Sequence, residues 1–292
     1  MALLFGMPGN EELTEELAEL TAAETGRIET RGFPDGESYV RIHGTAAQKA
    51  FLICTLAHPD EQFLPLVFAA RTIRALGASS LTLIAPYLAY LRQDAEFHAG
   101  EAISSRIFAD LIGREFDALM TIDPHLHRYA SLGEVYDTPT TVVHAGPLIA
   151  VWIKENADAP VVLGPDEESA QWVEEIAREV GCPWAIFRKE RRGDRDVRLI
   201  APALEQYREC TPVLVDDIIS SGATMIEASK LIIAAGMQPP HCLAVHRLFD
   251  DATAAELRGV TQSLLTTDSI PNPYGQLKVA PLIAEQLATV SA

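Results

Sequence analysis

The sequence has few cysteines and no long apolar run. Four of its 292 residues are cysteine, at positions 54, 182, 210 and 242, and none has the CxxC spacing of a zinc or redox site. We expect free, mostly buried thiols, which fits a reducing cytoplasm. No segment approaches the roughly 18 to 20 apolar residues of a membrane helix. The N-terminus lacks the basic lead and apolar length of a signal peptide. We therefore expect a soluble cytoplasmic protein with no membrane contact.

Positive charge is also scarce. The chain has 23 Lys and Arg against 41 Asp and Glu, a formal net charge of −18, and a pI of about 4.8. This balance argues against nucleic acid or an anionic membrane as partner. An acidic protein can still bind an anionic metabolite where the site is locally basic or loaded with metal. The few clusters of cations are therefore informative.

Segments typical of strands and helices alternate along the whole chain, which predicts α/β domains with parallel sheets. We expect a boundary near residues 140–146, where two Pro-containing pairs interrupt the pattern, and two similar doubly wound domains at 1–143 and 144–278. The predicted strands are 2–5, 38–42, 50–54, 81–85, 118–122, 142–143, 161–163, 184–187, 213–215, 241–246 and 263–266. The predicted helices are 11–20, 61–76, 102–113, 147–155, 169–180, 224–235 and 279–287.

The most informative stretch is VLVDDIISSGATM at 213–225, in which an apolar strand leads through two acids and a small-residue loop into a helix. Such a loop presents free backbone N–H groups to an anion. It lacks the lysine of the GxxxxGK[ST] loop, so a Walker-type site is excluded. Asp216 and Asp217 would repel phosphate but could accept hydrogen bonds from ribose hydroxyls. Two alternatives are weaker: the acids only form a turn that caps the helix, or they belong to a receiver-type domain.

Two further loops carry side chains suited to a nucleotide. In GFPDGE at 32–37, the ring of Phe33 could stack on a purine and Asp35 or Glu37 could accept from an exocyclic amine. Alone, this segment would be an ordinary turn. In PYLAYLRQD at 86–94, Arg92 offers a planar fork to phosphate or a surface to a base. Alone, this loop could equally be a surface loop with an Arg–Asp pair.

Taken together, these motifs resemble a known family. The 213–225 stretch resembles the phosphoribosyl-pyrophosphate (PRPP) motif of type I phosphoribosyltransferases and PRPP synthetases. The FPDGE and RQD segments resemble the two halves of the ATP site of ribose-phosphate pyrophosphokinases, the PRPP synthetases, and EAISS at 101–105 resembles the stretch that follows RQD in that family. The resemblance covers nearly the whole chain. The resemblance implies two domains of the phosphoribosyltransferase type I fold, with the last helix, 279–288, packed back on the first. It also implies ATP and ribose 5-phosphate as substrates, Mg²⁺ as cofactor, and a homo-oligomer in which the FPDGE loop completes a neighbour's ATP site.

The resemblance further assigns residue roles. His125 and Asp166 would contact Mg²⁺, and Lys189 and Arg191, in the densest basic run, would be the catalytic cations on a flexible loop. ATP would be bound by Phe33, Asp35, Glu37, Arg92, Gln93 and Asp94. The sugar hydroxyls would be bound by Asp216 and Asp217, and the 5-phosphate by Ser220, Ser221, Gly222, Ala223 and Thr224.

One segment departs from the family pattern. Glu167-Glu168-Ser169 stands where relatives usually have a glycine pair after the metal-binding PD, and it adds two negative charges near a phosphate site. This departure leaves open a non-catalytic regulatory homologue as an alternative. A phosphoribosyltransferase is a second alternative, although it would need no adenine site.

Overall fold

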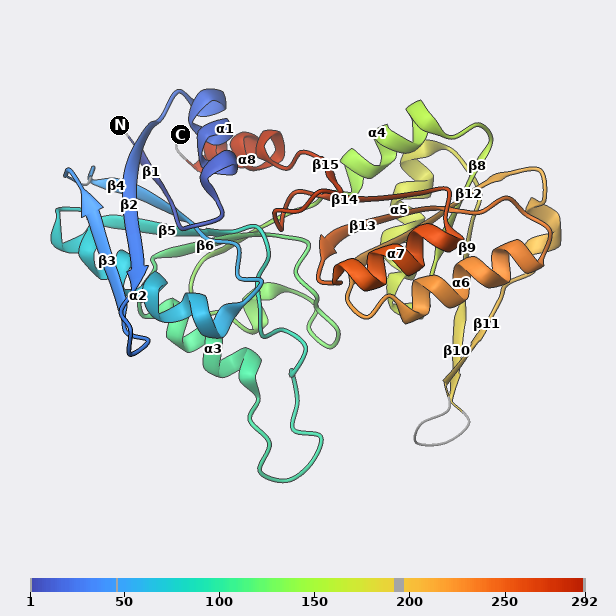
Figure 1. Ribbon diagram of the computed structural model, residues 1–292, viewed down its shortest axis with the longest axis horizontal. Helices are drawn as coiled ribbons and strands as arrows, with labels where there is room; N and C mark the ends of the chain where they lie inside the picture. The colour runs from blue at the N-terminus through green and yellow to red at the C-terminus, as the bar shows by residue number, and fades with distance from the viewer. Residues whose placement is uncertain (1, 46, 192–196, 291–292) are drawn as a thin grey trace. The chain divides into compact units, whose positions relative to one another are not determined.

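The structure, a computed structural model, describes residues 2–45, 47–191 and 197–290, with backbone alone at 191, 197, 198 and 290. The chain folds into two compact units (Figure 1). Unit 1 runs to His144 and takes in Ser269–Pro271 and the C-terminal segment from Val279. Unit 2 comprises Ala145–Asp268 and Asn272–Lys278. In the described part, no helix is both long and apolar enough to cross a membrane.

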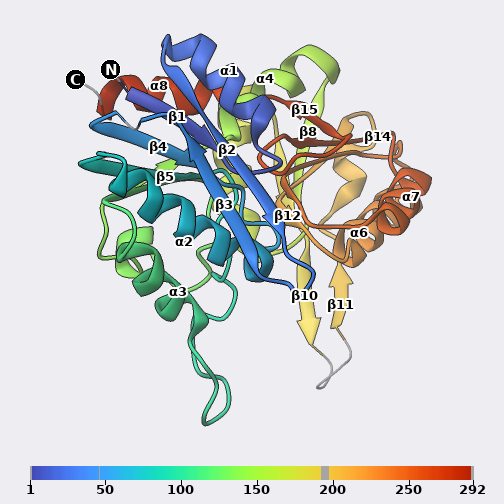
Figure 2. The ribbon, with the colours of Figure 1, turned by 60° about the vertical axis from the view of Figure 1, so that its left-hand side comes forward.

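Unit 1 is built on a seven-stranded sheet with the order β3-β2-β1-β4-β5-β6-β7, in which only β2 and β3 pair antiparallel. Helices α1 and α8 pack together on one face, and α2 and α3 lie on the other (Figures 1 and 2). Its elements are β1 (Ala2–Gly6), α1 (Glu11–Thr21), β2 (Glu24–Gly32), β3 (Ser38–His43), β4 (Lys49–Ile53), α2 (Pro59–Ala75), β5 (Ser80–Ala85), α3 (Ser104–Gly113), β6 (Ala118–Ile122), the 3-10 turn η1 (Leu132–Glu134), β7 (Thr140–Val143) and α8 (Ala280–Val290).

Unit 2 has a six-stranded parallel sheet with the order β15-β14-β13-β12-β8-β9, and a separate antiparallel hairpin of β10 and β11. Helix α4 packs against α5, and α6 against α7. Its elements are α4 (Gly146–Asn156), β8 (Pro160–Gly164), η2 (Glu167–Ser169), α5 (Ala170–Val180), β9 (Trp184–Ile186), β10 (Arg188–Arg191), β11 (Val197–Ile200), η3 (Leu204–Tyr207), β12 (Thr211–Ile219), α6 (Ala223–Ala234), β13 (His241–Arg247), α7 (Asp251–Val260), β14 (Ser263–Thr267) and β15 (Gly275–Leu277).

The two sheets share one strand order. Reading β2-β1-β4-β5-β6-β7 beside β9-β8-β12-β13-β14-β15, each strand of the unit 1 sheet except the edge strand β3 has a counterpart in unit 2. The central strands are buried on both faces, as the runs AFLI in β4 and PVLV in β12 predict. The prediction of two similar α/β domains with parallel-sheet cores is confirmed. Loops at the carboxyl ends of β4 and β12 therefore occupy corresponding places.

Several elements differ from the predicted ones. Strand β2 was not predicted, because its sequence ETGRIETRG has one aliphatic residue and its pairing with β3 leaves it largely exposed. Helix α7 was not predicted, because it is short and rich in alanine. It begins after Asp250, whose side chain accepts a hydrogen bond from the N–H of Thr253. The basic run, expected to form a flexible loop, begins in β10, which pairs with β11, and its remaining residues 192–195 lie outside the described residues. Strand β12 continues four residues beyond the predicted end at Val215, so the acid pair lies within it.

Candidate functional site

The acid pair of unit 2 lies in the second half of β12, beside β13. The backbone N–H of Asp217 donates to Asp216 Oδ1 at 3.1 Å, and the N–H of Ile218 donates to Asp217 Oδ1 at 2.7 Å. Burial, followed by the neighbouring carboxylates of Asp217 and Asp166, raises the pKa of Asp216 well above its ordinary value. The structure thus concentrates acceptors and negative charge at one point. Such a cluster suits a ligand that brings hydroxyl donors or a cation.

A loop of three residues joins β12 to α6. Its last two residues and the first two residues of the helix form an amide cradle, which we define as Ser221–Thr224. Gly222 has φ +70°, and a Cβ there would lie 2.5 Å from Thr253 Cγ2, so both conformation and space require glycine. Within the described residues, the backbone N–H groups of the cradle donate to no protein acceptor; the first bond of the helix runs from the N–H of Ile226 to the carbonyl of Gly222, at 2.9 Å. Free amides at a helix start bind anions such as phosphate. Ser220, also predicted for this site, is half-buried directly before the cradle.

Asp166 and Lys189 form an ion pair at the end of β8. Lys189 Nζ donates to Asp166 Oδ2 at 2.6 Å, and Asp166 Oδ1 accepts the N–H groups of Glu168 at 3.1 Å and Ser169 at 3.3 Å. The lysine side chain is 41% exposed and the carboxylate 15%. The backbone of Arg191 ends β10, while its side chain lies outside what the structure describes. The structure therefore brings one predicted metal ligand and one predicted catalytic cation together.

The Glu167-Glu168-Ser169 departure forms the 3-10 turn η2, for which Asp166 is the N-cap. Ser169 Oγ donates to the backbone carbonyl of Asp166 at 2.7 Å, and Glu167 lies 3.8 Å from Arg188 with both side chains largely exposed. The three residues thus hold the Asp166 backbone and carboxylate in place. The two added carboxylates belong to exposed residues.

In unit 1, the FPDGE loop is the turn of the β2–β3 hairpin. The N–H of Phe33 donates to the carbonyl of Glu37 at 2.7 Å, and the N–H of Glu37 donates to Asp35 Oδ1 at 3.1 Å. The Phe33 ring is 39% exposed, and the Arg31 guanidinium lies 4.5 Å from its centroid and 4.4 Å from that of Tyr39. A planar ligand would therefore meet an aromatic ring with a cation stacked on it.

A cavity of about 300 Å³ lies beside this hairpin, and the sequence analysis did not single it out. It involves strands β2 and β3, the end of β1 and the first turns of α2, which no local motif connects. Its lining combines charged, polar and apolar groups: Met7, Pro8, Thr30, Arg31, Gly32, Ser38, Tyr39, Cys54, Glu61, Gln62 and Pro65.

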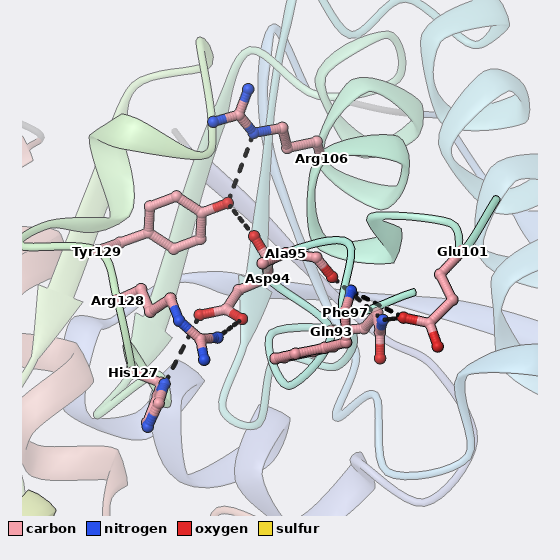
Figure 3. A network of polar contacts seen from close by, with 9 residues as sticks. All are labelled: Gln93, Asp94, Ala95, Phe97, Glu101, Arg106, His127, Arg128 and Tyr129. Carbon is pink, nitrogen blue, oxygen red and sulfur yellow. Dashed lines mark hydrogen bonds and ion pairs between the residues drawn. The ribbon is translucent and has the colours of Figure 1, made fainter. Parts of the chain in front are cut away.

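The three residues of the RQD segment have different surroundings. Arg92 is exposed. Gln93 Nε2 donates to the carbonyl of Ala95 and to Glu101 Oε2, both at 3.2 Å. The Asp94 side chain is only 1% exposed and accepts a hydrogen bond from Arg128 (Figure 3). Of the three side chains, Arg92 is the one most open to a ligand.

His125 lies in the loop after β6 and is half-buried, with its ring 6.4 Å from that of His127 and nearly parallel to it. The loop begins at Asp123, whose φ of +32° is unusual for a residue other than glycine. The N–H of Asp123 donates to the carbonyl of Val143 at 3.0 Å, and its carboxylate lies 2.8 Å from His144 Nδ1. His125 is thus presented at the carboxyl edge of the unit 1 sheet, where α/β proteins bind ligands.

The residues present suit Mg²⁺ only if substrate completes its coordination. The described residues include no group of three or more His, Cys, Asp or Glu side chains placed to hold a metal ion. Mg²⁺, however, is usually bound by one or two carboxylates together with substrate phosphates and water. The oxygen-rich acid cluster of unit 2, in which burial and then the neighbouring carboxylates raise the pKa of Asp216, fits that mode.

Comparisons with known proteins cover almost the whole chain. Residues 2–114 match the model of the N-terminal domain of ribose phosphate pyrophosphokinase, and residues 131–272 match the phosphoribosyl transferase domain. The ribose-phosphate pyrophosphokinase of Methanopyrus kandleri is 31% identical over 96% of both chains, and that of Saccharolobus solfataricus is 32% identical over 92% of this chain and 93% of its own. The crystal structure of phosphoribosylpyrophosphate synthetase from Mycobacterium smegmatis has the same fold, with a TM-score of 0.86 and 23% identity over 99% of this chain and 98% of its own.

Proposed function

Because the chain belongs to the ribose-phosphate pyrophosphokinase family, we propose that it transfers the β,γ-diphosphoryl group of ATP to the 1-hydroxyl of ribose 5-phosphate, giving PRPP and AMP. The observation that carries this proposal is the conjunction in unit 2 of paired acids with an amide cradle that has no protein acceptor among the described residues. Phosphoryl transfer requires positioning and charge stabilisation more than covalent chemistry.

Ribose 5-phosphate would bind with its 5-phosphate on the cradle and Ser220, and with its 2- and 3-hydroxyls donating to Asp216 and Asp217. Burial of Asp216 among carboxylates supports this assignment, since an acceptor-rich and poorly solvated group gains most from hydroxyl donors. Ordinary phosphate binding alone would not require the acids. Their place in β12, directly before the loop, makes a phosphorylated sugar the best match.

In the reaction, the oxygen of the 1-hydroxyl attacks the β-phosphorus in line, the bond from that phosphorus to the bridging oxygen of AMP breaks, and the hydroxyl proton is released. Lys189 and Arg191 would neutralise the negative charge that develops on the transferred group. Lys189 is paired with Asp166 at 2.6 Å in the structure, so it would exchange this partner for phosphate oxygens during turnover. Asp166 in unit 2 and His125 in unit 1 are the residues that would hold Mg²⁺, and the ion would supply positive charge to phosphate oxygens when bound.

We assign ATP to the loops of unit 1. Phe33 would stack on the adenine, with Asp35 and Glu37 near its polar edge, and Arg92 and Gln93 would complete the site. The exposed FPDGE turn supports the further proposal of a homo-oligomer in which this loop serves a neighbouring copy. The four free cysteines support a cytoplasmic location.

One assay tests the proposed function against both alternatives. The protein is incubated with ATP, Mg²⁺ and ribose 5-phosphate, and AMP and PRPP are measured by ³¹P NMR. We expect equal amounts of both products, with none when ribose 5-phosphate is omitted. A phosphoribosyltransferase would instead consume PRPP and a nucleobase, and a regulatory homologue would form no AMP. Either result would overturn the proposal.

A further inference from the structure

The loop that carries His125 is fixed at both of its ends. At its start, Asp123 is held by the carbonyl of Val143 and by His144. At its end, Arg128 Nη1 lies 2.5 Å from Asp94 Oδ1, and the hydroxyl of Tyr129 donates to the backbone carbonyl of Asp94 at 3.1 Å. The second attachment ties the loop after β6 to the loop after β5 (Figure 3). The loop after β5 also carries Arg92.

Asp94 is poorly placed to contact a ligand. Its side chain is 1% exposed, and the Arg128 guanidinium that neutralises it also lies 4.9 Å from the centroid of the Phe97 ring. A buried carboxylate that loses its cationic partner is strongly disfavoured. Contact between Asp94 and a nucleotide would therefore require the loop to open and the ion pair to break.

From this geometry we infer that Asp94 and Arg128 are positioning residues, which act as one unit to hold His125 and Arg92 in the arrangement that binds ATP with its metal. This inference rests on the proposed function and narrows it, because it removes Asp94 from the direct contacts of ATP. The remaining carboxylate oxygen of Asp94 points toward the same loop, with His127 Nδ1 at 3.9 Å. Asp94 thus faces the loop after β6 with both of its oxygens.

The test compares Arg128→Met, Arg128→Lys, Asp94→Asn and the double variant with the wild-type protein. Binding of a non-hydrolysable ATP analogue with Mg²⁺ is measured by calorimetry, and KM for ATP and for ribose 5-phosphate by AMP formation. Replacing a residue that orients a ligand-binding group typically weakens binding or activity 10- to 100-fold. We expect about that loss in analogue affinity and KM for ATP with Arg128→Met, and less than a twofold change in KM for ribose 5-phosphate.

The pair itself predicts two further results. Arg128→Lys keeps the charge and should recover most of the analogue affinity, and the double variant should bind no worse than Arg128→Met alone. Arg114→Met, which removes an arginine from an exposed pair with Asp110 in the same unit, is the matched control and should bind as the wild type does. A variant that only lost folded protein would show fewer binding sites at unchanged affinity.

Three outcomes would overturn the inference. Arg128→Met could bind the analogue normally, Arg128→Lys could be as weak as Arg128→Met, or Asp94→Asn could lose binding while Arg128→Met keeps it. The last would make Asp94 a direct contact. Failure of the proposed function is distinguishable, because a wild-type protein that forms no AMP from ribose 5-phosphate would still yield the analogue affinities of all variants.

Discussion

The loops after β4 and β12 occupy corresponding places in the two units, but their backbone donors are used differently. In unit 1, four donors of this loop are bonded within the chain, at 2.9 to 3.0 Å. The N–H groups of Cys54 and Leu56 donate to the carbonyls of Ile84 and Tyr87, respectively. The N–H groups of Thr55 and His58 donate to the side-chain oxygens Asn10 Oδ1 and Gln62 Oε1, respectively. The helix that follows begins with Pro59, which has no N–H. In unit 2, the cradle donates to no protein acceptor among the described residues.

This difference shows how one strand order can carry a phosphate site in one unit and a closed loop in the other. A side chain from the loop after β1, Asn10, replaces an external acceptor in unit 1. Among the described residues of unit 2 no side chain does so, and the loop passes close to Thr253 at Gly222. The topology supplies the location, and a few local donors and acceptors decide whether a ligand is needed there.

The strongest expected effect concerns the cation paired with Asp166. Lys189→Ala should lower kcat by roughly two to three orders of magnitude with little change in ribose 5-phosphate affinity, since one charged donor at a transition state contributes about 3 to 4 kcal/mol. Rate measurements at saturating substrates check this. Lys154→Ala, at an exposed position in the same unit, should be neutral. A Lys189→Ala enzyme with most of its turnover would exclude this lysine from the chemistry.

A side chain at position 222 should make the cradle of unit 2, like the loop after β4 in unit 1, a poor site for phosphate. Gly222→Ala forces a side chain into a left-handed conformation and against Thr253, so we expect ribose 5-phosphate affinity to fall about 10- to 100-fold by calorimetry. Gly259→Ala, where an added Cβ meets nothing within 4 Å, is the matched control. Normal affinity in Gly222→Ala would argue against phosphate binding at the cradle.

The acid pair of unit 2 should lower the folding stability of the ligand-free protein at neutral pH. A carboxyl group with a raised pKa in the folded state binds its proton more tightly there than in the unfolded chain, so its contribution to stability declines as pH rises from its ordinary pKa through the raised one. Asp216→Asn lacks this effect. Without Mg²⁺ or sugar, it should raise the melting temperature at pH 7.5 by about 2 °C or more, and less at pH 5.

Calorimetric scans of the wild type and Asp216→Asn at the two pH values measure this difference in melting temperature. A difference in melting temperature that shrinks as pH rises has the wrong sign and would show that burial and the neighbouring carboxylates do not disfavour the ionised form of Asp216. The same substitution should weaken ribose 5-phosphate binding, which a purely structural acid would not do.

The smallest effect on ligand binding is expected in unit 1. Asn10→Ala leaves the buried N–H of Thr55 without its acceptor and should cost roughly 1 to 3 kcal/mol of stability. Its ribose 5-phosphate affinity should stay within twofold of wild type. Thermal unfolding and calorimetry together check this pair of results, and a large loss of sugar affinity would contradict the separation between the two loops.

Much of the fold could be predicted because apolar runs such as AFLI and PVLV are long enough to mark buried parallel strands. The missed strands are polar or charged segments that are held by pairing with the neighbouring strand of a hairpin and not by apolar runs of their own. Strand β2 depends on its antiparallel pairing with β3, and the basic hairpin of β10 and β11 carries too much charge to be read as strand. Local pattern does not encode such pairings.

For the site, the motifs of the sequence pointed to candidate residues, but they did not show which charged side chains would pair with one another. The VDD loop and its glycine could be interpreted from residue types alone. The burial of Asp94 against Arg128 and the pairing of Lys189 with Asp166 join residues 34 and 23 positions apart. Only the folded chain reveals that these groups already have partners.

Hydrogen–deuterium exchange on the two loops tests the central claim most directly. In the ligand-free protein, the amides of 221–224 should exchange within seconds and those of Cys54, Thr55, Leu56 and His58 slowly, because only the latter are bonded within the described chain. Saturating ribose 5-phosphate should protect 221–224 and leave 54–58 unchanged. Absence of protection at 221–224, or equal protection in both loops, would contradict a phosphate site built from the open amides of unit 2.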